Sequence, residues 1–319
     1  MNSLELRIAE TEADHAAMLD VIHEAFAARK PLDPPAAALT ETAESLAELL
    51  ETGVGVLVSD DGVDVATLVL ALHGQGSAPD GSEAAMLHRV SVLPGARQFG
   101  VAAVLVRAAA ELAADAGFTF LQLMARSELP EVIEWWRQYG FEIIEDVPLG
   151  HLMGRALPVP IEVPTAEAMQ NLGERLAHIL KAGDVLVATG ELGAGKTTLT
   201  QGLASGLGVS GAVISPTFVL ARVHPGDGGP NLVHVDAYRL SSPAELEDLD
   251  LETSLADSIT LVEWGLGFVR DLTDSWLDIT IRRSDDPEDD VRTVYVAGMG
   301  ERWRDVDLKA ELGSDESSY

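Results

Sequence analysis

The chain has 319 residues, of which 47% are hydrophobic and 23% are charged, a composition that excludes a mostly disordered or collagen-like protein and predicts two domains with separate cores. Its 21 lysines and arginines against 52 aspartates and glutamates give a net charge of −31, which disfavours unaided binding to nucleic acid or to an anionic membrane surface. Cysteine is absent, and this excludes disulfides, thiolate catalysis and cysteine-bound zinc.

The first residues, Met1 to Arg7, lack the basic stretch and the apolar run that are typical of a secretory signal. The sequence also contains no stretch of 18 uncharged apolar residues that would predict a transmembrane helix. We therefore expect a cytoplasmic protein without a membrane partner.

Short strands alternate with helices in the N-terminal half, so the expected fold class is α/β. The runs at 54–58 and 63–72 predict a hairpin that turns at Asp60, Asp61 and Gly62, because an Asp-Gly pair tolerates the positive φ of a tight turn. Farther along, the pattern predicts a strand at 86–92, a helix at 101–116, a strand at 118–125 and a helix at 130–139.

The turn after the strand at 86–92 contains Arg97, Gly100 and Ala102 in an R-x-x-G-x-A pattern. Backbone amides from Phe99 to Ala102 at the start of a helix can hold an anion, and Gly100 lets a diphosphate approach closely. The turn is therefore a candidate phosphate site.

This turn, together with the sequence WWRQYGF at 135–141, resembles the acyl-CoA pyrophosphate loop and the late helix of GNAT acetyltransferases. The similarity covers about residues 4–155 and implies a mixed sheet with flanking helices that binds acetyl-CoA. The residues that the resemblance assigns to this cofactor are Arg97, Phe99, Gly100, Val101 and Ala102.

For catalysis the sequence departs from the family pattern. The position of the family's tyrosine acid aligns with Trp136, and Tyr139 could replace it only with a shift in register. A glutamate often found on the central strand aligns with Met86, which leaves His88 or Glu83 as a base. Two hypotheses follow: an N-acetyltransferase that acts on an amine or a protein N-terminus, and an inactive module that binds acyl-CoA or docks a partner.

Prolines 158, 160 and 164 favour an extended connector, and we place the domain boundary there. Thr165 can cap the helix that follows, whose apolar stripe includes Met169, Leu172, Leu176, Ile179 and Leu180. The predicted organisation is a GNAT-like domain at 1–157, a Pro-rich linker at 158–164, a second domain at 165–305 and an acidic, disordered tail at 306–319.

The strand predicted at 184–189 leads into residues 190–197, which fit the phosphate-binding pattern G-x-x-x-x-G-K-[ST], and a helix is predicted to start at Lys196. The glycines let successive amides point at the β-phosphate, and the helix N-terminus adds partial positive charge. We expect Lys196 to contact the β- and γ-phosphates and the Thr197 hydroxyl to bind Mg²⁺. The expected nucleotide contacts are Glu191, Leu192, Gly193, Ala194, Gly195, Lys196, Thr197 and Thr198.

A P-loop enzyme also needs a carboxylate at the end of a neighbouring strand. Asp236 ends the apolar run LVHVD at 232–236, and Glu263 ends the run ITLVE at 259–263. The run before Glu263 reads more clearly as a buried strand than the run before Asp236. We therefore assign Glu263 to Mg²⁺, and Asp236 to orienting water or sensing the γ-phosphate. A small P-loop kinase is the weaker alternative, because the C-terminal half has few arginines and no evident lid.

Four blocks in this order resemble TsaE, a family of small bacterial ATPases needed to make threonylcarbamoyladenosine in tRNA. The blocks are GELGAGKTT at 190–198, SPTF at 215–218, HVDAYRL at 234–240 and LVEWG at 261–265. The similarity covers roughly residues 162–304. It implies a compact P-loop sheet with flanking helices that uses ATP and Mg²⁺, works with TsaB and TsaD, and meets tRNA only through that complex.

Residue by residue, the resemblance implies that Lys196 and Thr197 hold phosphate and metal, that Glu263 binds the metal and that Asp236 takes part in hydrolysis. It also implies that Thr165 approaches the adenine. The sequence is therefore interpreted as a bifunctional fusion of a GNAT-like acetyltransferase with a TsaE-like ATPase. The alternative is the same ATPase joined to an inactive GNAT-like module.

Overall fold

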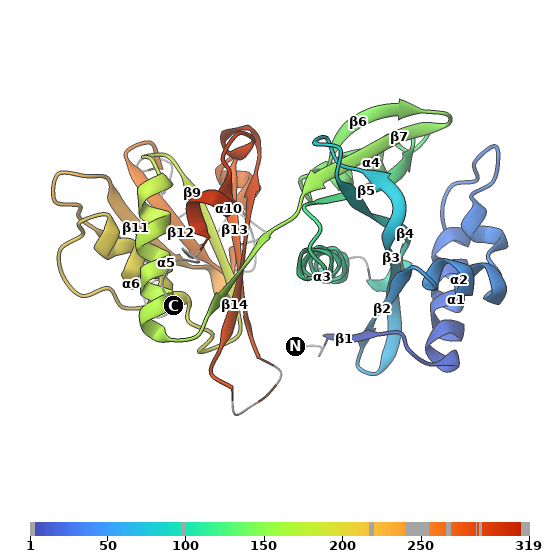
Figure 1. Cartoon of the computed structure of the whole chain (residues 1–319), viewed down its shortest axis with the longest axis horizontal. Coiled ribbons are helices and arrows are strands. Elements are labelled where there is room, and N and C mark those ends of the chain that lie inside the picture. The colour runs from blue at the N-terminus through green and yellow to red at the C-terminus, as the bar shows by residue number, and fades with distance from the viewer. Residues whose placement is uncertain are drawn as a thin grey trace. The chain divides into compact units, whose positions relative to one another are not determined.

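The computed structural model describes residues 4–96, 100–216, 220–239, 255–265, 269–284, 286 and 289–313. The chain divides into two compact units, residues 1–157 and 158–319. Each unit has a seven-stranded mixed sheet of its own with flanking helices (Figure 1), as the α/β interpretation predicts.

The first unit has the strand order β1-β2-β3-β4-β5-β7-β6, in which only β4 and β5 are parallel neighbours. Its elements are β1 (Leu4–Ile8), α1 (Glu12–Ala27), α2 (Ala43–Leu50), β2 (Gly53–Asp60), β3 (Val63–Ser77), β4 (Glu83–Val92), α3 (Val101–Asp115), β5 (Phe120–Arg126), α4 (Pro130–Arg137), β6 (Glu142–Val147) and β7 (Gly150–Ala156). The predicted hairpin is confirmed as β2 and β3, with Asp61 and Gly62 both at positive φ.

Alternation along the strands gives this sheet two apolar faces, because successive side chains point to opposite sides. Val56 and Val58 of β2 pack in the core with α3 and α4, whereas Leu57 between them packs with α1 and α2. The two helix pairs therefore cover opposite faces (Figure 1).

The second unit has the order β10-β11-β12-β9-β13-β14-β8, with β11, β12, β9 and β13 parallel. Its elements are β8 (Val159–Val163), α5 (Ala166–Ile179), β9 (Val185–Gly190), α6 (Lys196–Gly206), β10 (Ala221–His224), β11 (Asn231–Asp236), β12 (Ser258–Glu263), α9 (Val269–Leu272), β13 (Trp276–Arg283), β14 (Arg292–Met299) and α10 (Leu308–Leu312). The carboxyl ends of parallel strands meet at one edge, where α/β proteins bind ligands.

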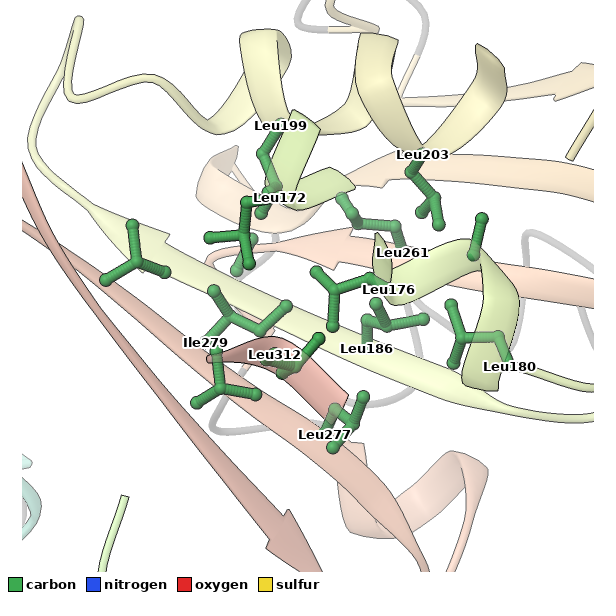
Figure 2. Packing of buried hydrophobic residues seen from close by; sticks show 14 of the residues in the cluster. Leu172, Leu176, Leu180, Leu186, Leu199, Leu203, Leu261, Leu277, Ile279 and Leu312 are labelled. Atoms are coloured by element: carbon green, nitrogen blue, oxygen red, sulfur yellow. The ribbon is translucent and has the colours of Figure 1, made fainter. Parts of the chain in front are cut away.

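Leucines of α5 and α6 pack on one face of this second sheet, and Figure 2 shows Leu172, Leu176 and Leu199 among the strand side chains. The two helices approach closely because glycines face the contact. A Cβ built on Gly202 of α6 would lie 2.0 Å from the Gln170 carbonyl oxygen of α5. This approach fixes where α6, and hence the loop before it, lies over the sheet.

Two expectations about the borders of this unit need correction. The proline-rich segment is not a free connector: residues 159–163 form β8, an edge strand paired with β14, and an edge strand tolerates proline because one side needs no amide donor. The start of the expected disordered tail is folded as α10, with Leu308 and Leu312 buried. Residues 314–319 lie outside the described part. Among the described helices, none is long and apolar enough to cross a membrane.

Candidate functional site

The loop between β9 and α6 has the backbone of a phosphate cradle. Gly193 and Gly195 adopt φ of +76° and +118°, which side-chain-bearing residues rarely adopt, and a Cβ on Gly195 would also press on Met169 at 3.2 Å. Gly195 is the N-cap of α6 and offers no side-chain hydrogen bond to the first turn. The first amides of α6 are therefore left for an anion.

Lys196 is buried at the start of α6 and turns back over this loop. Its Nζ donates hydrogen bonds to the carbonyl oxygens of Gly190 at 2.8 Å and Glu191 at 3.1 Å, and lies 4.5 Å from the centroid of the Trp264 ring. Burial lowers the pKa of Lys196, and the negative charges of Glu263 and Asp236 oppose that shift. The ammonium group is thus held inside the cradle, close to both carboxylates.

Asp236 and Glu263 end β11 and β12 and lie opposite each other in register. Both are buried, at 5% and 4% exposure, on the same edge of the sheet as Gly190. Glu263 Oε1 is 2.9 Å from Nε2 of His234, and Asp236 Oδ1 accepts a hydrogen bond from the Tyr238 amide. The structure thus brings together Lys196, Asp236 and Glu263, the three residues that the sequence singled out for catalysis.

The remaining predicted nucleotide residues occupy the loop and the first turn of α6. Ala194 is buried, Thr197 and Thr198 are half-buried, and Glu191 and Leu192 are exposed at the tip. Thr165 is already used structurally: its hydroxyl caps α5 by accepting from the Ala168 amide. Of the block at 215–218, Thr217 and Phe218 lie outside the described residues.

Sequence reasoning missed two neighbours of the loop. Arg283, at the end of β13, donates from Nη2 to the Leu192 carbonyl at 3.2 Å, and no motif marks it. Trp264 sits at φ +62° with its ring beside Lys196 and 5.5 Å from Tyr238. A bulky residue at positive φ is costly and indicates a backbone that its surroundings hold in place.

The predicted acyl-CoA loop is described only in part, because Arg97 and Phe99 lie outside the described residues. Gly100 has φ +70° and caps α3 without a side-chain bond, Val101 is buried and Ala102 is half-buried. The register of parallel β4 and β5 ends at Leu87 and Leu123, although β4 continues to Val92. The start of α3 therefore offers backbone amides without a side-chain cap, and it follows the part of β4 that is no longer paired with β5.

Two aromatic residues bear on acid catalysis in this first unit. Trp136 is buried in the core with its ring 5.1 Å from that of Phe141. Tyr139 packs on Trp135, and burial raises the pKa of its hydroxyl. Trp136 cannot donate the proton that a leaving thiolate needs, and the raised pKa makes Tyr139 a weaker acid.

The candidate bases differ in their surroundings. His88 is half-buried on β4, and its Nε2 is buried without a hydrogen-bond partner among the described residues. Burial, aided by the charge of Arg89, lowers the pKa of His88. Glu83 is exposed, with an oxygen 3.6 Å from Nδ1 of His73. Of the two candidates, His88 is the one that is partly buried, and its lowered pKa keeps the imidazole neutral near pH 7.

Comparison with known proteins separates the two halves. Residues 163–293 match the family model for threonylcarbamoyl adenosine biosynthesis protein TsaE, and residues 18–141 match that of the acetyltransferase (GNAT) family. The tRNA threonylcarbamoyladenosine biosynthesis protein TsaE of Streptomyces coelicolor is 59% identical over 148 residues, 46% of this chain and all of that protein.

Solved structures divide in the same way. Bacillus subtilis YdiB is 33% identical, with a TM-score of 0.36, and covers 44% of this chain and 85% of its own. PaiA N-acetyltransferase from Thermoplasma acidophilum, solved with coenzyme A, is 14% identical, with a TM-score of 0.41, and covers 48% and 99%. From the identity to the Streptomyces protein, the chain belongs to the TsaE family through its C-terminal half, and its N-terminal half matches the GNAT family model.

Proposed function

We propose that the C-terminal unit, residues 158–319, hydrolyses ATP in support of threonylcarbamoyladenosine formation in tRNA, together with TsaB and TsaD. The observation that carries the proposal is that Lys196, in a loop whose glycines have positive φ, lies within electrostatic reach of two buried carboxylates that end neighbouring strands. Burying two carboxylates at one sheet edge is expensive unless a cation accompanies them. This cost favours a site built for a phosphate tail and its counter-ion.

The donor set fits Mg²⁺, which prefers hard oxygen ligands. Thr197 offers a hydroxyl at the start of α6, and Glu263 a carboxylate at the end of β12. When bound, the ion would neutralise charge on the phosphates. The chain's own part is to bind the phosphates through the loop amides and Lys196, and to orient the attacking water through Asp236.

The charge of the chain and its family both support the proposed partners. A net charge of −31 repels the tRNA backbone, so this protein would meet tRNA through a complex in which another subunit holds it. We propose that the nucleotide cycle resets that complex between turnovers in the cytoplasm. Purified TsaB and TsaD should give a higher multiple-turnover yield of modified tRNA when this chain is added than when it is left out. Equal yields would reject the role.

A complementation assay tests the loop itself. In cells depleted of their own TsaE, the wild-type chain should restore the tRNA modification and Lys196→Ala should not. Lys181→Ala, which removes an exposed lysine of the same domain, is the matched control. Rescue by Lys196→Ala would overturn the assignment of the phosphate loop.

For the N-terminal domain, residues 1–157, we propose acetyl-CoA-dependent transfer to an amine or a protein N-terminus. The uncapped start of α3 at Gly100 suits the cofactor diphosphate, and neutral His88 is the candidate base that takes the proton from the amine. The expected result is acetyl-CoA consumption with amine or peptide acceptors that falls strongly in His88→Gln.

A second candidate is an acyl-CoA-binding or partner-docking module without turnover. It is favoured by Trp136, which fills the core at the position where the family's acid is expected. Binding of coenzyme A without consumption of acetyl-CoA, over a panel of amines and peptides, would support this candidate and reject acetyl transfer.

A further inference from the structure

His234 is a buried imidazole whose hydrogen bond leads to the proposed metal ligand. The ring has no exposed surface, and its Nε2 lies 2.9 Å from Oε1 of Glu263 on the neighbouring strand. His234 and Asp236 share a face of β11, because side chains alternate along a strand. The ring therefore lies on the face that carries both carboxylates.

Among the described residues, Glu263 supplies the hydrogen bond of the His234 ring, and buried His224 lies near enough that the two imidazoles affect each other electrostatically. The Nδ1 of His234 has no hydrogen-bond partner among the described residues, and its same-face neighbours, Leu232 on β11 and its register partner Leu261 on β12, are buried and apolar. An aliphatic residue would fill such a position without the cost of burying polar atoms. The polar contact that the ring makes is the one to Glu263, in which a carboxylate oxygen accepts and the Nε2–H donates.

This bond restricts Glu263. A glutamate side chain has three rotatable bonds, and a hydrogen bond to Oε1 from a ring locked in the core removes much of that freedom. Oε1 already accepts a bond, so Oε2 keeps the greater capacity for a cation. Groups that orient a metal ligand in this way commonly change metal affinity about 10- to 100-fold when they are removed.

We propose that His234 is a positioning residue that holds the Glu263 carboxylate ready for the Mg²⁺ of MgATP. The inference rests on the proposed function, because it takes Glu263 as a metal ligand. It assigns to the histidine of the HVDAYRL block a task separate from that of Asp236.

The test compares His234→Gln with His234→Met in the full chain. The two side chains have nearly the same length and volume, but only glutamine keeps an N–H donor. Calorimetry would measure ATP binding with Mg²⁺ and with EDTA. We expect His234→Met to weaken binding at least about tenfold with Mg²⁺ and to leave it unchanged in EDTA. His234→Gln should recover most of the loss. Equal losses with and without Mg²⁺, or no loss, would overturn the inference.

Glu263→Gln supplies a check that does not depend on how well His234→Met folds. If His234 acts through Glu263, replacing it should cost nothing further in the Glu263→Gln background, for the glutamine and the methionine variants alike. An undiminished extra loss of Mg²⁺-dependent binding would overturn the inference. Failure of the proposed function is recognised separately, because the wild-type chain would then bind no ATP, or bind it without regard to Mg²⁺.

Discussion

Asp236 and Glu263 are register partners at the last residues of the neighbouring parallel strands β11 and β12. Their environments differ: Glu263 is bonded to a buried imidazole, whereas Asp236 accepts from the backbone amide of Tyr238 in the turn that follows its strand. Two carboxylates at one edge can therefore take different tasks. In the proposed function, Glu263 binds the metal and Asp236 orients the water.

The two roles predict different defects. Glu263→Gln should weaken Mg²⁺-dependent ATP binding, because an amide is a poorer ligand for a divalent cation. Asp236→Asn should bind MgATP nearly as the wild type does and lose most of its hydrolysis, by the 10²- to 10⁴-fold that is typical of losing a positioned base. Calorimetry and phosphate release measure the two effects. If Asp236→Asn lost Mg²⁺-dependent binding and Glu263→Gln lost only hydrolysis, the roles of the two carboxylates would have to be exchanged.

Arg283 belongs to no sequence motif, but it should contribute to nucleotide affinity by holding the phosphate-binding loop in place. Its guanidinium donates to the Leu192 carbonyl, and a Cβ on Gly193 would meet Nη2 at 2.7 Å. Arg283→Ala should weaken ATP binding by up to about tenfold, the value of one or two ordinary hydrogen bonds. Arg304→Ala, which removes the same charge from an exposed position, is the control. Equal affinities of both variants would show that Arg283 is uninvolved.

Close packing of α5 on α6 predicts a stability defect at Gly202. A Cβ there would meet the backbone of Gln170 at 2.0 Å, and backbone cannot turn aside as a side chain does. Gly202→Ala should destabilise the C-terminal domain by about 1–3 kcal/mol or more, despite the better helix propensity of alanine. Ser205→Ala, one turn along at an exposed position and bonded to half-buried Glu174, should cost less. Urea unfolding measures both, and an unchanged midpoint for Gly202→Ala would contradict the packing.

His88 predicts how stability depends on pH. Burial lowers its pKa in the folded chain, so below the ordinary value of about 6.5 the unfolded chain binds a proton that the folded chain resists. The contribution of His88 to stability is therefore present above that pH and is lost as the pH falls. His88→Gln should lose less stability between pH 7 and pH 5 than the wild type does. Exposed His178→Gln should behave as the wild type, and the same behaviour of His88→Gln would refute the reasoning.

Local patterns in the sequence predicted most elements and the P-loop. The strand, the glycine turn and the helix follow one another directly in the chain. The spacing from Gly190 to Lys196 is therefore enough to predict how they are arranged. The same holds for the hairpin at Asp61 and Gly62. Sequence could also propose Glu263 and Asp236, because each ends an apolar run.

What the sequence could not predict depends on contacts between distant segments. His234 and Glu263 are 29 residues apart, and only the register of β11 beside β12 brings them together. The proline-rich segment was misread because its prolines suit both a connector and an edge strand. Helix α10 is a single turn, too short to show a periodic pattern, and it forms where Leu308 and Leu312 find the core.

The most direct test is a crystal structure of the full chain with Mg²⁺ and a non-hydrolysable ATP analogue. The account predicts the phosphate tail against the amides of residues 193–197 and Lys196, with the metal within about 2.1 Å of the Thr197 hydroxyl and in contact with Glu263 directly or through one water. Phosphates bound elsewhere, or a metal that neither Thr197 nor Glu263 approaches, would contradict it.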